Sequence, residues 1–596
     1  PAIRSYVLES AENPTLRGRM VTLETGLHAL IATQSQTILI NPAVNERGES
    51  IHSSTFYTPD TTQTALSEQV FAVAEQQRER GGSTQILTDG QLRTYRIAIA
   101  ADGEFSQDQG GTLTATRATI VSRVNDLNVY FQMNAGIGLQ LVANNDALIF
   151  LDPATDPYLH PAQGLELFDQ NIATLDSVIG SANYDIGQLF SGERGGGTAY
   201  IGAVCENAIK AGGISGDGEL WIALHEIGHQ FNANHTFNGV SRACSVQAAN
   251  SAYEVGSGNS TMSYASFCGS DNVGERTLEF SLESIREIQQ FVQSGVGATC
   301  GSLTGSSNQA PVIVTGTTQI TLPASTPFTL VGHATDPDGD TLSYAWVEHD
   351  LGPAGHPNQP SGNAPLFRWL EPDADNTRTL PQMSDLLAGR QTIGELLPNY
   401  TRNLAFRFMV RDDGDLPASR YANLQVAIAG ESGPFRVLSP NRGESWQAGG
   451  SGLVTWDVAG SDLPPVNCLT VNIDLSLDGG VTYPLALATN VANDGGQQVV
   501  VPDGASEAAR VRVACATYPD HFFFDISDSD FEIVTNSAAT FAMTANPQQV
   551  ALCGGESVDV KLAFEPFAGF SAELPLTLTL PLSAEISANL PNTTTV

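Results

Sequence analysis

The chain has 596 residues, of which 64 are acidic and 27 are basic, so its formal net charge is -37. A surface this acidic repels phosphate backbones and anionic membranes, which argues against nucleic acid and lipid as partners. No apolar run of about 18 residues or more occurs, so we expect no membrane insertion. At about 100 to 200 residues per domain, the length predicts about three to five domains.

The cysteine pattern indicates disulfides. Seven cysteines are spread along the chain without a close C-x-x-C pair. This spacing favours an oxidising, extracellular compartment over a zinc ribbon or a redox motif. Four lie in the first half, two lie together later and one is left over: Cys205, Cys244, Cys268 and Cys300, then Cys468 and Cys515, then Cys553. The last either pairs with a residue beyond Val596 or is a buried thiol.

The N-terminal part, residues 1–88, is predicted to be a small β-rich unit. Residues 1–70 alternate short β-branched runs with polar loops, as in HALIATQSQTILINPA. The stretch TALSEQVFAVAEQQRERGG at 64–82 permits a helix and ends in a basic, glycine-rich joint at 78–82. Such a joint is typical of a linker, which places the boundary of this unit shortly before residue 89.

Residues 89–303 are predicted to form an α/β domain. TYRIAIAADGEF at 94–105 alternates as a strand does, and 112–134 has helical spacing without internal proline or glycine. A strand or strand pair at 137–150 and a second helix at 164–180 follow. Strands that alternate with helices indicate an α/β layer.

Beyond residue 310 the helical pattern mostly disappears. Short β-branched strands are separated there by Gly, Pro, Asn and Asp turns, as in Ig-like or PKD-like β-sandwich modules. We therefore predict a multidomain chain with β modules at 310–430, at 431–537 and at 538–596, the last of them incomplete.

The segment GELWIALHEIGHQF at 218–231 predicts a metal-binding helix. Its apolar residues at 220, 224, 227 and 231 form one buried helical stripe. His225 and His229 are one turn apart, so both imidazoles project from the same side and can bind one ion. Glu226 lies beside them, where it can act as a general base toward water at the metal.

A third histidine, His235, follows His229 by six residues and cannot share its face on a continuous helix. The chain must turn first, and Asn232 is the residue that best tolerates a left-handed conformation at this position. Three neutral imidazoles with one open position are the pattern of catalytic zinc, because structural zinc sites are closed by four protein ligands.

The alternative is that these histidines merely pack or are solvated, but the full pattern arises by chance in such a chain with a probability of only about 10⁻⁴. Gly228 adds a weaker signal. Glycine inside a helix costs about 1 kcal/mol relative to alanine, so we expect another backbone to approach closely there, unless Gly228 is a tolerated irregularity.

HEIGHQFNANH, followed by GSGNSTMSYASFCG at 256–269, resembles the metzincin zinc endopeptidases. With ANNDALIF and GSANYDIGQLF, the chain is most similar to the secreted bacterial reprolysin-like (adamalysin-type) enzymes over residues 91–303. The resemblance implies an α/β fold with an active-site helix, a methionine turn at Met262 below the metal, and a substrate cleft along an edge strand. GGTAYIGAVC at 196–205 fits that edge.

Two positions depart from the family. Asn232 stands where a glycine is usual, and Tyr264 follows Met262 by two residues, as in astacin and serralysin turns. The similarity implies that Tyr264 either ligates zinc or stabilises the oxyanion, whereas the alternative is an ordinary packed aromatic. Met262 is expected to be structural in either case.

The resemblance implies peptide-bond hydrolysis. Zinc held by His225, His229 and His235 would activate a water, and Glu226 would move its proton to the leaving amine. We therefore predict a secreted, monomeric zinc endopeptidase that acts on extracellular proteins or peptides. The alternatives are a secreted adhesion protein with an inactive peptidase-like domain, or the same zinc site acting on crosslinked cell-wall peptides.

Residues 1–88 resemble part of a pro-region, with separation between Arg78 and Asp89. No cysteine precedes Cys205, so latency in this segment cannot use a thiolate on zinc and must use another ligand or occlusion. A permanently attached N-terminal β domain is the alternative.

The stretch ATDPDGDTLSYAW predicts a calcium site, because Asp336, Asp338 and Asp340 place alternate carboxylates in one tight turn. It is not an EF-hand, since Val347 stands where a bidentate glutamate is required. The turn is similar to acidic loops of PKD-like and cadherin-like modules, and RDDGDLP at 411–417 offers a further carboxylate. The alternative is a solvated acidic turn.

Overall fold

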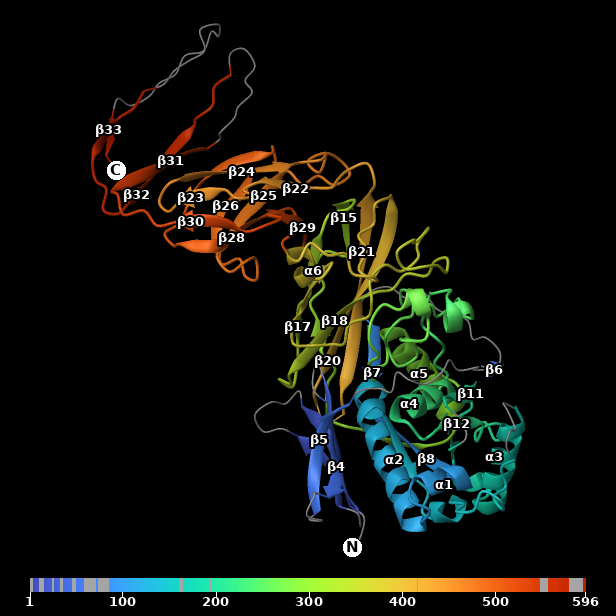
Figure 1. The fold of residues 1–596 in the computed structure, drawn as a ribbon. Coiled ribbons are helices and arrows are strands. Elements are labelled where there is room, and N and C mark those ends of the chain that lie inside the picture. Colours follow the sequence, from blue (N-terminus) through green and yellow to red (C-terminus); the bar gives the residue numbers. More distant parts are fainter. Residues whose placement is uncertain are drawn as a thin grey trace.

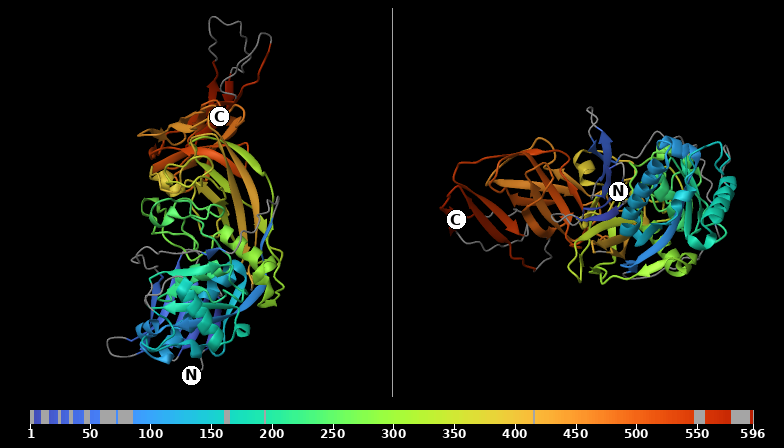
Figure 2. Two further views of the ribbon diagram at one scale, coloured as in Figure 1. Left: turned by 90° about the vertical axis from the view of Figure 1, so that its right-hand side faces the viewer. Right: turned by 90° about the horizontal axis from the view of Figure 1, so that it is seen from below.

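A computed structural model of the chain describes residues 4–9, 16–23, 26–32, 36–44, 50–57, 71–72, 85–159, 165–192, 195–414, 416–546, 556–577 and 593–595. The joint predicted at 78–82, most of the predicted helix at 64–82 and Cys553 lie outside these residues. The molecule is elongated, with helices α1 to α5 gathered at one end and the C-terminal strands at the other (Figure 1). Figure 2 shows the same arrangement from two further directions.

The α/β part contains one sheet with the strand order β13-β8-β10-β12-β11-β6, and β9 also pairs with β8. The strands from residue 92 onward are β8 Leu92–Ala101, β9 Ile137–Leu141, β10 Ile186–Ser191, β11 Gly197–Ile201, β12 Gly213–Gly216 and β13 Ser302–Thr304. The helices are α1 Gly103–Asp108, α2 Leu113–Ala135, α3 Leu165–Val178, α4 Leu220–Gln230 and α5 Leu282–Ser294. Strands β8, β9, β10 and β12 are parallel, whereas β11 is antiparallel to β12. The predicted α/β layer is thus confirmed.

Local sequence explains the central elements of this layer. Residues 97–100 of β8 are fully buried, as expected for a parallel strand covered on both faces. Helix α2 begins after Thr112, whose hydroxyl accepts the N–H of Ala115 at 3.2 Å, and it ends at Gly136 with a left-handed φ of 58°. The helix predicted at 112–134 is therefore confirmed to within one residue.

Short 3-10 helices and disulfides complete this part. The 3-10 helices are η1 Asn145–Leu148, η2 Ser181–Asn183, η3 Arg242–Ser245, η4 Gly269–Asp271 and η5 Val296–Thr299. Three disulfides join Cys205 to Cys300, Cys244 to Cys268 and Cys468 to Cys515, so the six paired cysteines are those that the sequence grouped together. Within the described ranges, no helix has the length and hydrophobicity required to cross a bilayer.

The N-terminal region forms an antiparallel meander of β1 Arg4–Glu9, β2 Arg17–Leu23, β3 Gly26–Ala32, β4 Thr37–Val44 and β5 Ser50–Phe56. Its strands lie beside α2 (Figures 1 and 2). Polar pairs cross this interface: Ser5 with Asn125, His28 with Asp126, Arg19 with Gln132 and Thr37 with Tyr130. The Tyr57 hydroxyl donates to the carboxylate of Glu219, which caps α4.

His28 is the buried ionisable group of the N-terminal interface. Its Nε2 lies 3.0 Å from Asp126 Oδ1 and its Nδ1 lies 2.6 Å from Asn41 Oδ1. Burial lowers the pKa of His28 and Arg123 opposes its charge, but the hydrogen bond and charge of Asp126, with the Asn41 oxygen, outweigh both. The pKa of His28 is therefore raised, and the folded state favours the imidazolium.

Two short strands link the N-terminal region to the rest of the molecule. β6 Phe71–Ala72 pairs in parallel with Tyr200–Ile201 of β11. β7 Gln85–Asp89 pairs with β21, more than 300 residues later in the chain, and Thr88 Oγ1 lies 2.9 Å from Ser419 Oγ. The boundary predicted between residues 88 and 89 therefore falls inside a strand.

The region from 310 onward is almost entirely β-structure, as predicted. Its strands are β14 Val312–Ile313, β15 Gln319–Pro323, β16 Phe328–Val331, β17 Ala334–Thr335, β18 Leu342–Glu348, β19 Thr377–Leu380, β20 Arg402–Asp412, β21 Ala418–Ala429, β22 Arg436–Ser439, β23 Ser445–Gln447, β24 Ser451–Asp457, β25 Thr470–Ser476, β26 Leu485–Ala492, β27 Gly496–Val500, β28 Ser506–Cys515, β29 His521–Ile526, β30 Phe531–Val534, β31 Thr540–Asn546, β32 Lys561–Phe567, β33 Glu573–Pro575 and β34 Thr593–Thr595, with one short helix, α6 Met383–Leu387.

Contacts cross the predicted module boundaries. β16 pairs with β29, so one sheet contains strands from both 310–430 and 431–537. Apolar residues of β18, β20 and β21, namely Val347, Met409 and Tyr421, belong to the same hydrophobic core as the α/β part. The first β region therefore packs directly against the α/β domain.

The raised pKa of His28 predicts pH-dependent docking of the N-terminal sheet. A raised folded-state pKa stabilises the interface fully below the unfolded value of about 6.5, and this contribution is lost as pH rises through the folded pKa. Asp126→Asn should therefore reduce the protection of β3 amides from hydrogen exchange at pH 5.5, by about 1 to 3 kcal/mol. The effect should shrink at pH 9.

Asp146→Asn is the matched control, because Asp146 pairs with Arg117 on the exposed side of α2. Exchange rates are corrected for their intrinsic pH dependence. An equal loss of protection at both pH values in Asp126→Asn would contradict the role of a charged His28.

Candidate metal centre

Helix α4 and the turn after it bring three histidines together. Every residue of α4 is buried, and His225 and His229 lie one turn apart on it. The helix ends at Gln230 with Phe231 as its C-cap, and Asn232 takes a φ of 73°, which confirms the predicted left-handed turn. The chain then returns, so that the Nε2 atoms of His225, His229 and His235 lie 3.1 to 3.2 Å from one another.

Hydrogen bonds to carbonyl groups fix two of the imidazole tautomers. His225 Nδ1 lies 2.7 Å from the Thr261 carbonyl oxygen, and His229 Nδ1 lies 2.7 Å from that of Ala233. A carbonyl oxygen only accepts, so each Nδ1 carries the proton and each neutral ring directs a lone pair from Nε2. Lone pairs this close repel one another unless a cation lies between them. Nitrogens at these separations suit one zinc ion at about 2.0 to 2.1 Å.

Two backbone carbonyl groups of the turn after residue 259 bind the histidine segment. Thr261 supplies the carbonyl that binds His225, and the Met262 carbonyl accepts the N–H of Thr236, next to His235, at 3.2 Å. Met262 is fully buried, and its Sδ atom would lie 2.6 Å from a Cβ placed on Gly228. A Cβ at residue 228 would therefore displace Met262, and the expectation of a close backbone was wrong, because the Met262 side chain and the Phe280 ring occupy that space.

Tyr264 lies against the histidines. It is 5% exposed, and its ring centroid is 4.6 Å from that of His235 and 5.9 Å from that of His225. Phe237 stacks on Tyr264, with ring centroids 4.6 Å apart, and its ring also lies 5.2 Å from that of His235. The structure thus places Tyr264 at the histidine cluster, in a position compatible with either of the roles considered for it.

Two buried carboxylates that sequence reasoning missed hold the chain on both sides of His235. Glu287 of α5 accepts the backbone N–H of Asn234 at 2.8 Å and the Ser251 hydroxyl at 2.6 Å. Glu254 accepts the Thr236 hydroxyl at 2.6 Å and the N–H groups of residues 259 and 260. No local sequence pattern marks either glutamate, because the groups that each one binds belong to other segments of the chain or to a loop.

Glu226 follows His225 on α4, and its side chain lies against strand β11. Its side chain is buried against Gly197, and a Cβ added at Gly197 would overlap the Glu226 carboxylate. Gly197 therefore makes room for this carboxylate, a role that sequence reasoning did not assign. In the described sheet, β11 bonds to β12 on one side and to β6 on the other.

The three predicted calcium ligands also lie together, with one oxygen of each of Asp336, Asp338 and Asp340 within 4.8 Å of the others. Asp336 Oδ1 accepts the N–H groups of Asp338 and Asp340, as in an ordinary acidic turn. Asp413 approaches as anticipated, since it accepts the Thr341 N–H at 2.8 Å. Burial and the neighbouring Asp336 raise the pKa of Asp412 to about 6, and burial and three nearby aspartates raise that of Asp340.

Comparison with known families decides the class of the α/β domain. Residues 91–290 match the metallo-peptidase family M12B, reprolysin-like. This segment is a reprolysin-like metallopeptidase domain. The resemblance to reprolysin-like metzincins is thereby confirmed, and zinc is the metal that the family implies for the three histidines. No curated protein matches the chain.

Three solved structures are distant likenesses of the chain. Immunoglobulin domains 1–5 of Sidekick-1 are 9% identical, with 44% of this chain and 46% of that chain covered and a TM-score of 0.14. Fibronectin(III)-like modules of Clostridium thermocellum CbhA are 10% identical over 38% of this chain and 94% of theirs, with a TM-score of 0.15. Human CDH23 EC21-23 is 13% identical over 39% and 65%, with a TM-score of 0.15. Scores this low support no inference about the β region or its partners.

Proposed function

We propose that the chain is a secreted zinc-dependent endopeptidase that hydrolyses peptide bonds of extracellular proteins. The observation that carries this proposal is the convergence of three Nε2 atoms beside Glu226 within a reprolysin-like domain. Zinc bound by His225, His229 and His235 would supply a Lewis acid that polarises a carbonyl group and lowers the pKa of water. The three disulfides support an extracellular location.

Glu226 is proposed as the general base. Its carboxylate takes a proton from the attacking water as the new C–O bond forms and the carbonyl oxygen becomes an oxyanion; it then gives that proton to the amine nitrogen as the peptide C–N bond breaks. Tyr264 is proposed to stabilise the oxyanion through its hydroxyl, since its ring contacts both His225 and His235. Gly197 has no side chain and so leaves the space that the Glu226 carboxylate occupies.

An extended polypeptide is the proposed substrate because β11 offers a strand edge. A substrate that pairs with this edge is held through its main chain, independently of much of its side-chain sequence. The pairing of β6 with Tyr200–Ile201 shows that this edge of β11 accepts a further strand. We infer that substrate takes the same edge.

The same pairing supports a proposed pro-region at residues 1–88. β6 occupies the proposed substrate edge, and Tyr57 contacts Glu219 at the start of the active-site helix. Burial raises the pKa of Tyr57, and the Glu219 carboxylate adds to this, so the hydroxyl keeps its proton and donates. Latency would then come from strand β6 covering the edge of β11, and not from a thiolate bound to zinc, because this segment contains no cysteine.

Loss of Glu226 tests the proposed reaction. Digestion of a proteome-derived peptide library, read by mass spectrometry, should give internal cleavages with the unaltered chain. Glu226→Gln should lower the rate by about 10² to 10⁴, and a zinc chelator should abolish cleavage. Glu275→Gln, an exposed surface control, should leave the rate unchanged. Cleavage that survives Glu226→Gln or chelation would place the chemistry elsewhere, and zinc binding without any cleavage favours the adhesion alternative.

Gly197→Ala tests the positioning of Glu226. The new methyl group must displace the carboxylate, so kcat for peptide hydrolysis should fall by about 10² while zinc content stays the same. Gly195→Ala is the matched control, since nothing lies within 4 Å of a Cβ at residue 195. Equal activity of both alanine variants would show that Glu226 tolerates displacement or is not the base.

Controlled cleavage tests the pro-region. Residues 78–84 are replaced by the recognition sequence of a site-specific protease, and peptide hydrolysis is measured before and after cutting. Activity should rise at least about tenfold once the N-terminal region is free to leave β11. Unchanged activity, with the released fragment separated from the enzyme, would support a permanent N-terminal β domain instead.

Calcium is proposed for the turn at Asp336, Asp338 and Asp340. If the site binds calcium only when folded, 100 times the dissociation constant stabilises the chain by about 2.7 kcal/mol, seen as a higher melting temperature of the β region. Asp340→Asn should remove most of this effect, whereas Asp503→Asn, at an exposed aspartate elsewhere, should not. A melting temperature that does not respond to calcium would contradict the calcium site and support the alternative, a solvated acidic turn.

A further inference from the structure

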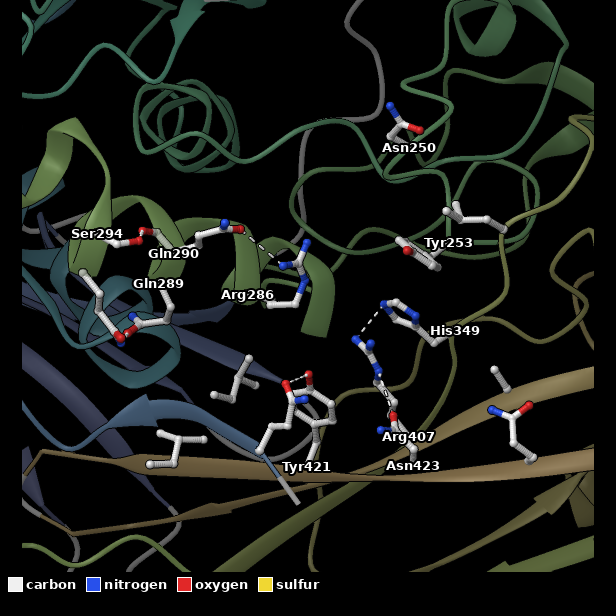
Figure 3. A pocket seen from close by; sticks show the side chains of 17 residues that line it. Asn250, Tyr253, Arg286, Gln289, Gln290, Ser294, His349, Arg407, Tyr421 and Asn423 are labelled. Carbon is white, nitrogen blue, oxygen red and sulfur yellow. Dashed lines mark hydrogen bonds between the residues drawn. The ribbon is translucent and has the colours of Figure 1, made fainter. Parts of the chain in front are cut away.

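A cavity lies beside the packed interface between the reprolysin-like domain and the first β region and is lined by residues of both. Its volume is about 1360 Å³, which exceeds the 300 to 1000 Å³ of common small-molecule sites, so an oligomeric ligand suits it better. One wall is the face of α5 that carries Arg286, Gln290 and Gln293. The opposite wall is one face of the sheet, formed by Arg407 and by alternate residues of β21 at 421, 423 and 425. We call this space the α5 cavity (Figure 3).

The lining of the α5 cavity differs from the rest of this acidic chain. Among the described residues that line it are seven carboxamides, two arginines, two tyrosines and one histidine, and none is aspartate or glutamate. The whole chain has 64 acidic and 27 basic residues, so a surface of this size without a carboxylate is unusual for it. The cavity is therefore a place where an anionic group meets less repulsion than elsewhere.

Internal hydrogen bonds leave mainly donors for a ligand. The carboxamide oxygens of Gln85, Asn423 and Gln290 already accept from Tyr421, Arg407 and Arg286. The carboxamide nitrogens of Gln85, Gln290 and Asn423 have no protein partner among the residues that the structure describes. A ligand rich in acceptors, such as peptide carbonyls and carboxylates, complements such a surface better than sugar hydroxyls, which require donors and acceptors alike.

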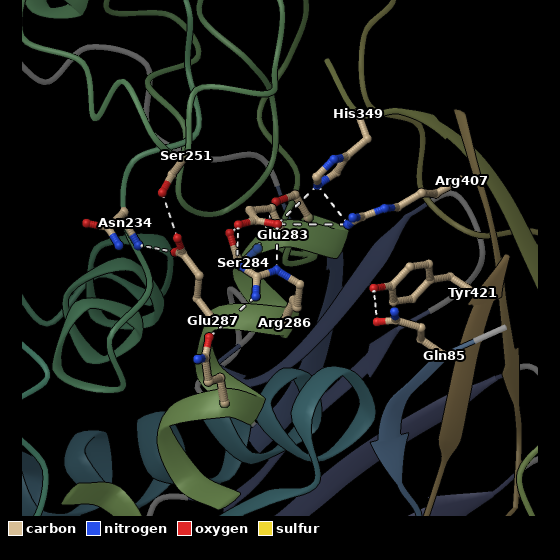
Figure 4. A network of polar contacts seen from close by, with 12 residues as sticks. Gln85, Asn234, Ser251, Glu283, Ser284, Arg286, Glu287, His349, Arg407 and Tyr421 are labelled. Carbon is tan, nitrogen blue, oxygen red and sulfur yellow. Dashed lines mark hydrogen bonds and ion pairs between the residues drawn. The ribbon is translucent and has the colours of Figure 1, made fainter. Parts of the chain in front are cut away.

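A buried ionic network closes one end of the α5 cavity (Figure 4). Arg286 donates to both oxygens of Glu283, at 2.9 and 2.6 Å. From the β region, Arg407 Nη1 donates to His349 Nε2 at 2.8 Å and lies 4.0 Å from Glu283. Burial lowers the pKa of His349 to about 4, so the ring is neutral at pH 7, and the charges of Arg286 and Arg407 are balanced by those of Glu283 and Glu287 in the same network.

The α5 cavity is built on the elements that hold the metal ligands. Tyr253 lines it and stacks on His349, with ring centroids 3.6 Å apart. The next residue, Glu254, binds the hydroxyl of Thr236 after His235, and Glu287 of α5 binds the N–H of Asn234 before His235. A ligand in the cavity would therefore rest on the same rigid unit as the catalytic site.

We propose that the α5 cavity binds a carboxylate-bearing polypeptide segment of the substrate, away from the bond that is cut. This inference deepens the proposed function and rests on it for the identity of the ligand as substrate. The cavity does not specify the direction, length or exact sequence of the bound peptide, because carboxamides bind peptide groups of any residue. Acidic side chains would add ion pairs with Arg286 and Arg407.

Binding is tested apart from hydrolysis, in a Glu226→Gln background. The probe is a fluorescein-labelled peptide of alternating Glu and Gly, followed by anisotropy, with an alternating Ser and Gly peptide and an oligogalacturonate as comparisons. Gln293 and Gln425 are exposed lining residues, so their replacement should not disturb folding. The pair Gln293→Glu and Gln425→Glu should weaken binding of the acidic peptide about tenfold or more by charge repulsion.

The pair Gln293→Lys and Gln425→Lys should instead tighten binding of the acidic peptide. Gln498→Glu, an exposed change in distant β27, should have no effect on this binding. The proposal is overturned if the acidic peptide does not bind, if both charged pairs bind it alike, or if only the oligogalacturonate binds. Hydrolysis by the unaltered chain is scored separately: peptide binding without cleavage keeps the cavity and rejects the peptidase, whereas cleavage without charge-sensitive binding rejects the cavity alone.

Discussion

The site depends on one geometric constraint, the enforced proximity of three imidazole Nε2 atoms. Carbonyl groups of Thr261 and Ala233 take the Nδ1 protons, so two rings cannot turn their N–H groups toward the cluster. Without a cation the arrangement is repulsive, and the fold must supply the free energy that holds it. The left-handed Asn232, the Met262 turn and the two carboxylates beside His235 are the contacts that do so.

Sequence reasoning succeeded where a short-range rule sets the geometry. A spacing of four residues on a buried helix puts two imidazoles on one side, and a third histidine beyond the helix end requires a turn that Asn232 can make. Helix α2 was equally accessible, because Thr112 and Gly136 mark its two ends. In each case the decisive contacts join residues within one or two helical turns.

It failed where the partner is far away in the chain. Gly228 signalled a close neighbour but could not tell a backbone from the Met262 sulfur, which arrives from a turn more than 30 residues later. Gly197 and Glu287 look like ordinary strand and helix residues until folding brings them beside Glu226 and His235. Likewise, the pairing of β16 with β29 is set by tertiary packing. The local sequence of neither strand predicts that the two predicted modules share a sheet.

The short strand β7 has a topological consequence. It precedes the reprolysin-like domain in the chain, yet its partner β21 follows that domain by more than 100 residues. The reprolysin-like domain therefore lies in the sequence between β7 and the other strands of the same sheet, β15, β18, β20 and β21. A fragment that begins at Gln85 and lacks β21 would carry β7 as a strand with an open edge, the kind of surface that promotes aggregation.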